Sequence, residues 1–154
     1  MTASDLLARI VDGSTATAVA SCVHPGLPVP KARARVATSR RGKRHGYTPK
    51  RTEEAEGALA VSLLAARCGA GLRVLSGRVA LAVVVRFRRA ARGDWDNYGK
   101  LVSDAGNKVA WADDRQIKRA VVVVEDGAGR DETEVAWCGL DTPDTAPPGA
   151  RRPR

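Results

Sequence analysis

Five aspartates and two lysines lie in a short stretch that reads GDWDNYGKLVSDAGNKVAWADDRQ, and four of the aspartates form two close pairs. Asp94 and Asp96 are two residues apart, and Lys100 follows one helical turn after Asp96. Asp113 and Asp114 are adjacent further along the chain. Unpaired carboxylates that lie close together repel one another, and a hard cation removes that penalty. Carboxylate oxygens suit Mg²⁺ or Mn²⁺, so the stretch predicts a metal site with ligands from both aspartate pairs.

The rest of the chain is basic, which indicates the class of partner. Lys and Arg number 26 against 17 Asp and Glu, for a formal net charge of +9. Residues 31–51 contain no acidic residue, and Gly and Ser interrupt them without apolar periodicity, so we predict a loop. Its like charges repel, which favours nucleic acid as a partner over a merely solvated charge run. The candidate DNA-binding residues are Lys31, Arg33, Arg35, Arg40, Arg41, Lys43, Arg44, Lys50 and Arg51.

These two groups of residues together predict phosphate chemistry. The basic loop would hold phosphates, and a carboxylate-bound metal would polarise one phosphate and generate hydroxide from water. Lys100 would stabilise the charge that develops on the phosphate or orient the water. The alternative is that the aspartates are helix caps and solvated turn residues.

Six segments have the apolar patterns of regular secondary structure. They are strands at 15–23, 77–87, 119–126 and 132–140, a helix starting at Thr48 and Pro49 and ending at 68–71, and a helix capped by Asp96. This order predicts an α/β fold, a single small domain over residues 1–140 with helices packed on a mixed β-sheet. Residues 141–154 are rich in Pro and Arg and predict a disordered tail.

The predicted elements place the two aspartate pairs near each other. Asp94 and Asp96 lie where a strand leads into a helix, and in an extended segment residues two apart face the same side. Asp113 and Asp114 follow that helix, where the chain turns back towards the sheet. The helix and the next strand therefore form a hairpin-like unit that brings both pairs together.

Several other classes of protein are disfavoured by the sequence. The 3 cysteines are widely spaced, which predicts neither a disulfide framework nor a zinc site. The longest apolar runs, such as 79–85, are too short to cross a bilayer, and the N-terminal residues do not resemble a signal peptide. We therefore expect a cytoplasmic protein without membrane contact.

The spacing of the acidic stretch resembles a known family. DWDNYGKLVSDAGNKVAWADDRQ is similar to the D-x-D-N-x-x-K…D-A-x-N…W-x-D-D-x-Q pattern of the RusA family of Holliday junction resolvases. PVPKARARV and YTPKRTEEAE resemble the basic loop and helix start of its phage-type members, so the resemblance covers roughly residues 23–125. It implies a RusA-like fold and a homodimer that cuts two strands of branched, four-way DNA.

The resemblance also assigns roles to single residues. It implies that Asp94, Asp96 and Asp114 bind Mg²⁺, with Mn²⁺ able to substitute, and that Lys100 is a catalytic lysine. Asp113 remains the alternative to its neighbour as a ligand.

The chain departs from the family pattern at Ala34, Gly99, Gly106 and Lys108, but no proposed ligand is missing. The two glycines would each cost a helix interior about 1 kcal/mol relative to Ala. Two other functions remain open: a related nuclease acting on flaps, forks or duplex DNA, and a non-catalytic DNA-binding protein. The intact set of acidic residues and lysine argues against the second.

Overall fold

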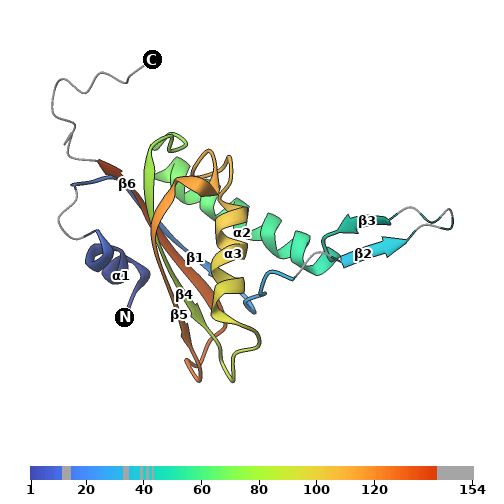
Figure 1. Cartoon of the computed structure of the whole chain (residues 1–154). Helices are drawn as coiled ribbons and strands as arrows, with labels where there is room; N and C mark the ends of the chain where they lie inside the picture. Colours follow the sequence, from blue (N-terminus) through green and yellow to red (C-terminus); the bar gives the residue numbers. More distant parts are fainter. Residues whose placement is uncertain (12–14, 33–34, 39, 41, 43, 142–154) are drawn as a thin grey trace, which may run out of the picture.

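The computed structural model describes residues 1–11, 15–32, 35–38, 40, 42 and 44–141 (Figure 1). Along the chain the elements are α1 (Ala3–Ile10), β1 (Thr15–Pro25), β2 (Arg35–Thr38), β3 (Arg44–Tyr47), α2 (Lys50–Gly69), β4 (Arg78–Arg86), α3 (Trp95–Ala105), the short 3₁₀ helix η1 (Asp114–Gln116), β5 (Ile117–Glu125) and β6 (Glu132–Asp141). The predicted tail, 141–154, lies outside the described residues except for Asp141, where β6 ends.

Four strands form a mixed sheet in the order β1-β6-β4-β5. β4 pairs parallel with β5 and antiparallel with β6, which in turn pairs antiparallel with β1. The near-continuous valine run of β4 is buried on both faces, as expected for a central strand. A mixed sheet with helices packed on it confirms the predicted α/β fold.

Alternate residues of β4 face two separate cores, one on each side of the sheet. Leu81 and Val83 belong to the larger core under α2 and α3, together with Leu63 and Tyr98. In the same core the indole rings of Trp111 and Trp137 meet edge to face, with centroids 6.3 Å apart. α3 is therefore fixed against the sheet by its apolar face, which leaves its polar side available for chemistry.

The N-terminal helix α1 covers the opposite face of the sheet, and the sequence analysis did not predict it. Leu6 and Leu7 are buried against Ala82 and Val84 of β4. Thr2 forms a capping box with Asp5, which starts the helix. α1 lies on the other side of the sheet from α2 and α3 (Figure 1).

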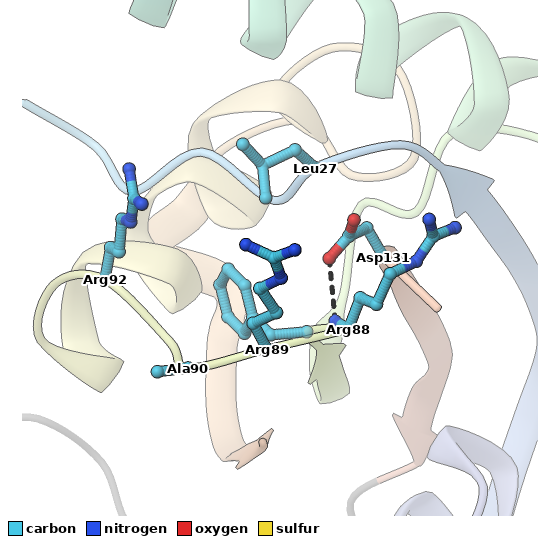
Figure 2. Close-up of a pocket in the computed structure, with 7 residues that line it drawn as sticks. Leu27, Arg88, Arg89, Ala90, Arg92 and Asp131 are labelled. Carbon is cyan, nitrogen blue, oxygen red and sulfur yellow. Dashed lines mark hydrogen bonds between the residues drawn. The ribbon is translucent and has the colours of Figure 1, made fainter. Parts of the chain in front are cut away.

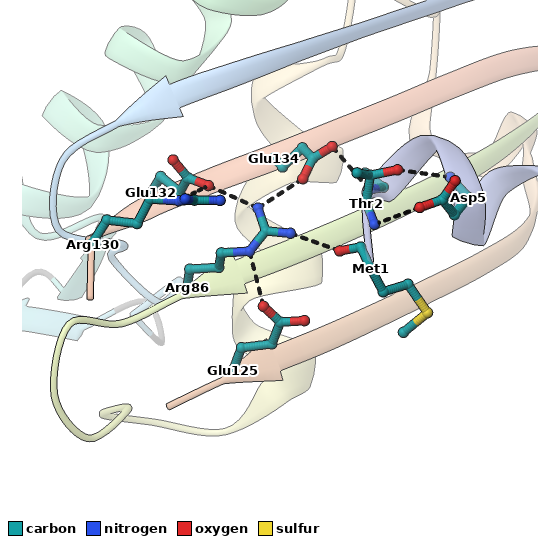
Figure 3. A network of polar contacts seen from close by, with 9 residues as sticks. Met1, Thr2, Asp5, Arg86, Glu125, Arg130, Glu132 and Glu134 are labelled. Carbon is teal, nitrogen blue, oxygen red and sulfur yellow. Dashed lines mark hydrogen bonds and ion pairs between the residues drawn. The ribbon is translucent and has the colours of Figure 1, made fainter. Parts of the chain in front are cut away.

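Arg86 anchors the start of α1 to the sheet (Figure 3). Its guanidinium donates to Glu125, Glu132 and Glu134 on the neighbouring strands and to the carbonyl of Met1. The second oxygen of Glu134 accepts the backbone N–H of Ala3 at 3.0 Å. One buried cation thus connects three strands to the N-terminus of the helix.

The basic segment 31–51 is not simply a loop, so that prediction was wrong. β2 and β3 pair antiparallel, with Arg35 opposite Tyr47 and Thr38 opposite Arg44. The hairpin projects away from the main sheet near the start of α2 (Figure 1). A two-stranded hairpin is marginally stable by itself.

Gly106 does not lie in a helix interior, contrary to the assumption made from the sequence. It is the C-cap residue of α3. A Cβ atom placed on it would lie 2.1 Å from the buried indole ring of Trp111. The glycine therefore allows Trp111 to pack closely against the end of α3. The sequence had suggested only that Gly106 would destabilise the helix.

Candidate active site

The first turn of α3 presents two aspartates to solvent. Gly93 has φ near +107°, and a Cβ there would approach the ring of Pro30 to 3.1 Å, so glycine suits the position. Asp94 is the N-cap residue with extended backbone angles, and Asp96 is inside the first turn. The prediction that Asp96 caps the helix and that both residues share one extended segment was therefore wrong.

Both carboxylates are exposed and carry unneutralised charge. Asp94 makes no side-chain capping hydrogen bond. Asp96 accepts the backbone N–H of Asn97 at 3.0 Å. Within the described part of the chain, neither aspartate forms an ion pair with Lys, Arg or His. Two such carboxylates are available to a cation.

Lys100 joins the middle of α3 to η1. Its ammonium nitrogen lies 2.7 Å from Asp114 Oδ2 and 2.9 Å from Asp104 Oδ1. Hydrogen bonds to Asp104 and Asp114 raise the pKa of Lys100, so the lysine stays charged at neutral pH. Lys100 and Asp114, two of the predicted site residues, are 14 positions apart in the sequence, and the fold brings their side chains into contact.

Asp113 has a different task from its neighbour. Its carboxylate accepts the backbone N–H of Arg115 at 2.9 Å and caps η1. That hydrogen bond is the main reason why the pKa of Asp113 is lowered. The backbone N–H of Asp113 donates to Gln116, whose amide in turn donates to the carbonyls of Leu75 and Gly77. Asp113 and Gln116 therefore fix the turn that presents Asp114.

The pair Lys100–Asp114 belongs to a longer chain of alternating charges. Lys31 contacts Glu56 of α2 at 2.5 Å and Asp104 of α3 at 3.0 Å, and Asp104 contacts Lys100. Burial alone would lower the pKa of Lys31, but its hydrogen bonds to Glu56 and Asp104 outweigh that effect and raise it. The sequence analysis assigned no role to Glu56 and Asp104, because the residue that connects them, Lys31, is distant from both in the sequence.

The acidic residues fit a hard cation in donor chemistry. Asp94, Asp96 and Asp114 offer carboxylate oxygens only, which is the ligand type that Mg²⁺ prefers. Among the described residues, however, the structure gathers no group of three or more His, Cys, Asp or Glu side chains that could hold a metal ion. In this arrangement Lys100 supplies the positive charge that neutralises Asp114.

Comparison with known proteins settles the family. The family described as Endodeoxyribonuclease RusA matches residues 25–136, which is more than half of the chain. This chain belongs to the RusA endodeoxyribonuclease family. The resemblance inferred from the acidic stretch is thereby confirmed, and the family is one of nucleases, which are hydrolases. No curated protein sequence matches the chain.

The match places the candidate site within the RusA region and α1 outside it. All of β4, α3, η1 and β5 fall inside residues 25–136, whereas α1 precedes them. The Arg86 anchor therefore joins α1, which precedes the matched residues, to strands within and beside the matched region. In the described ranges of this RusA chain, the structure contains no helix that is long and apolar enough to span a membrane.

The predicted DNA-binding residues of this RusA chain fall into three groups. The side chains of Arg40, Arg44, Lys50 and Arg51 are exposed. Lys31 is held in its two ion pairs. Arg33, Arg41 and Lys43 lie outside the described residues, as does the side chain of Arg35, whose backbone is in β2.

A second basic cluster, which the sequence analysis missed, lies in the loop between β4 and α3. Arg88, Arg89 and Arg92 line a cavity of about 270 Å³ together with Leu27, Phe87, Ala90 and Asp131 (Figure 2). Asp131 accepts the backbone N–H of Arg88 at 2.8 Å, which fixes the loop. The signal was present in the sequence as RFRRAAR, residues 86–92, which ends two positions before Asp94, so this RusA chain carries arginines next to its acidic residues.

Proposed function

We propose that the chain is a Mg²⁺-dependent endonuclease that resolves four-way DNA junctions by hydrolysing phosphodiester bonds. One structural observation supports the proposal above all: unpaired Asp94 and Asp96 begin the helix on which Lys100 holds Asp114. Family membership supports the activity class. A non-catalytic role would not explain why a chain of net charge +9 keeps these carboxylates exposed.

The proposed ligands of the ion are Asp94, Asp96 and Asp114. When bound, Mg²⁺ polarises the scissile phosphate and promotes the ionisation of water. Lys100 is proposed to stabilise the negative charge that builds up on the phosphate, which is consistent with its exposed position beside Asp114. The capping role of Asp113 supports the choice of Asp114, because a carboxylate engaged in a cap is less available to a metal.

Two basic surfaces are proposed to hold the DNA backbone. One is the hairpin with the start of α2, which exposes Arg40, Arg44 and Lys50. The other is the arginine cavity beside α3 (Figure 2). Guanidinium groups bind phosphate oxygens well because their donors form a planar fork. Paired incision of a junction needs two active sites, so we propose that the protein acts as a homodimer.

A substrate comparison tests this proposal. Labelled four-way junction, flap, fork and linear duplex DNA would be incubated with the protein and Mg²⁺, and the products would be mapped on denaturing gels. We expect paired incisions in the junction and little cleavage of the duplex. Preferential cleavage of flaps or forks would identify a related nuclease, and binding without cleavage would identify a non-catalytic DNA-binding protein. Sedimentation at several protein concentrations measures the dimer.

A further inference from the structure

Beside the proposed metal ligands, a groove of about 410 Å³ runs between α3 and β5. Its rim includes Trp95, Asp96, Asn97 and Lys100 from α3. Trp95 is 65 % exposed, whereas Trp111 and Trp137 are fully buried. The large aromatic side chain between the two acidic residues is therefore not used by the core, and its exposed ring is free to contact a ligand.

The floor of the groove is apolar, and a glycine determines its shape. Leu81 and Val122 of the sheet line it, with Ala120 at the side. A Cβ atom on Gly99 would lie 2.9 Å from a methyl group of Val122, so only glycine lets α3 approach β5 this closely. The result is a shallow apolar surface with charged groups at its edge.

Polar groups on the rim suit an aromatic heterocycle better than an aliphatic ligand. The side-chain amide of Asn97 makes no hydrogen bond with the described residues, so it can donate to and accept from a ring edge. Because Asp96 and Lys100 line the groove, it lies next to residues that are proposed to act on the phosphate. The arginine loop that carries Arg92 leads directly into Trp95, so an occupant attached to an anionic backbone matches the charges around the groove.

We propose that this groove is a nucleobase subsite in which Trp95 stacks on an unpaired base next to the scissile phosphate. The inference rests on the proposed nuclease function and adds a determinant of substrate choice: DNA with bases free to unstack, as at a branch point. Stacking of a base on an aromatic side chain corresponds to about 5- to 150-fold in affinity. A second copy of the chain on the same groove would cover Asp96 and Lys100, which argues against that occupant.

The test measures DNA binding without cleavage. In an Asp94→Asn background, fluorescence anisotropy would compare Trp95→Ala, Trp95→Phe and Val61→Ala on fork DNA with unpaired bases and on fully paired duplex. Val61 is a matched control because it is 66 % exposed on α2 and does not line the groove. We expect Trp95→Ala to weaken fork binding at least 5-fold, Trp95→Phe to retain most of it, and duplex binding to change little. Circular dichroism checks that each variant is folded.

A fluorescent base analogue locates the contact. 2-Aminopurine at an unpaired position of the fork should change its fluorescence emission when the protein binds. That change should depend on Trp95. Equal fork affinity for parent and Trp95→Ala, or an unchanged 2-aminopurine signal, would overturn the inference. So would dissociation of a dimer by Trp95→Ala with DNA affinity intact, since the groove would then be a protein interface. If the parent cleaves no DNA but binding depends on Trp95, the nuclease proposal fails and the subsite stands.

Discussion

Replacement of Arg86 by methionine should destabilise the protein strongly. Arg86 is only 6 % exposed, and its guanidinium lies 2.9, 2.7 and 2.8 Å from the carboxylates of Glu125, Glu132 and Glu134. Methionine fills similar volume but leaves three acidic groups without their shared cation. Removing one partner of a buried ion pair costs about 3–5 kcal/mol. We expect Arg86→Met to lower the free energy of unfolding by an amount in that range.

Arg130→Met is the matched control, because Arg130 donates to the same Glu132 oxygen at 2.8 Å. Its side chain is 61 % exposed, and surface ion pairs contribute at most about 1 kcal/mol. Urea unfolding of parent and both variants at pH 7 measures the difference. Limited proteolysis near residue 10 should also become faster in Arg86→Met, since α1 loses its anchor at Met1.

The pH dependence gives a second check on the same reasoning. Burial alone would raise the pKa of Glu132, but hydrogen bonds from Arg130 and Arg86 outweigh burial and lower it. A carboxyl group whose pKa is lowered in the folded state stabilises the fold at pH values above its ordinary pKa of 4.5. This stabilisation is lost as the pH falls through the folded-state pKa. The effect of Arg86→Met should therefore shrink below pH 4.5. A loss no larger than that of Arg130→Met at pH 7 would refute the account.

Three further predictions concern the acidic site and the basic hairpin. Asp96→Asn should abolish cleavage while junction affinity, measured by gel shift, stays equal or rises. Removing a negative charge near phosphates cannot weaken electrostatic attraction, so weaker binding would contradict this prediction. Asp114→Asn should abolish cleavage, whereas Asp113→Asn should keep more activity, because an asparagine side-chain oxygen can still cap η1. The reverse order of activities would make Asp113 the ligand. Arg40→Ala with Arg44→Ala should reduce the slope of log K against log[salt] by up to about 1.8, since each phosphate contact contributes about 0.9. An unchanged slope in salt titrations would show that the hairpin is merely solvated.

The parts of the fold that local sequence patterns determine could be predicted. The valine run of β4 suited a central strand, and the spacing of the acidic stretch identified the family. The position of Asp94 as the cap could not be read in advance, because Asp94 and Asp96 are equally good capping residues. In the structure Gly93, with its positive φ, directly precedes the helix, and Asp94 is the cap residue.

Contacts between distant residues were beyond the reach of sequence patterns. Lys31 looked like one more phosphate ligand in a basic run, but Glu56 and Asp104 neutralise it in the fold. α1 is only 8 residues long, and its stability depends on burial against β4 and on Arg86. The strands of the hairpin are only 4 residues each, so their alternation was too short to distinguish from a charged loop.

Single-turnover cleavage of a four-way junction tests the central claim most directly. Parent and Asp94→Asn would be mixed at saturating concentration with labelled junction, in Mg²⁺ and in EDTA, and product formation followed over time. The account predicts paired incisions by the parent in Mg²⁺, none in EDTA, and none by Asp94→Asn although it binds the junction. Cleavage by Asp94→Asn at the parental rate, or by the parent in EDTA, would contradict it.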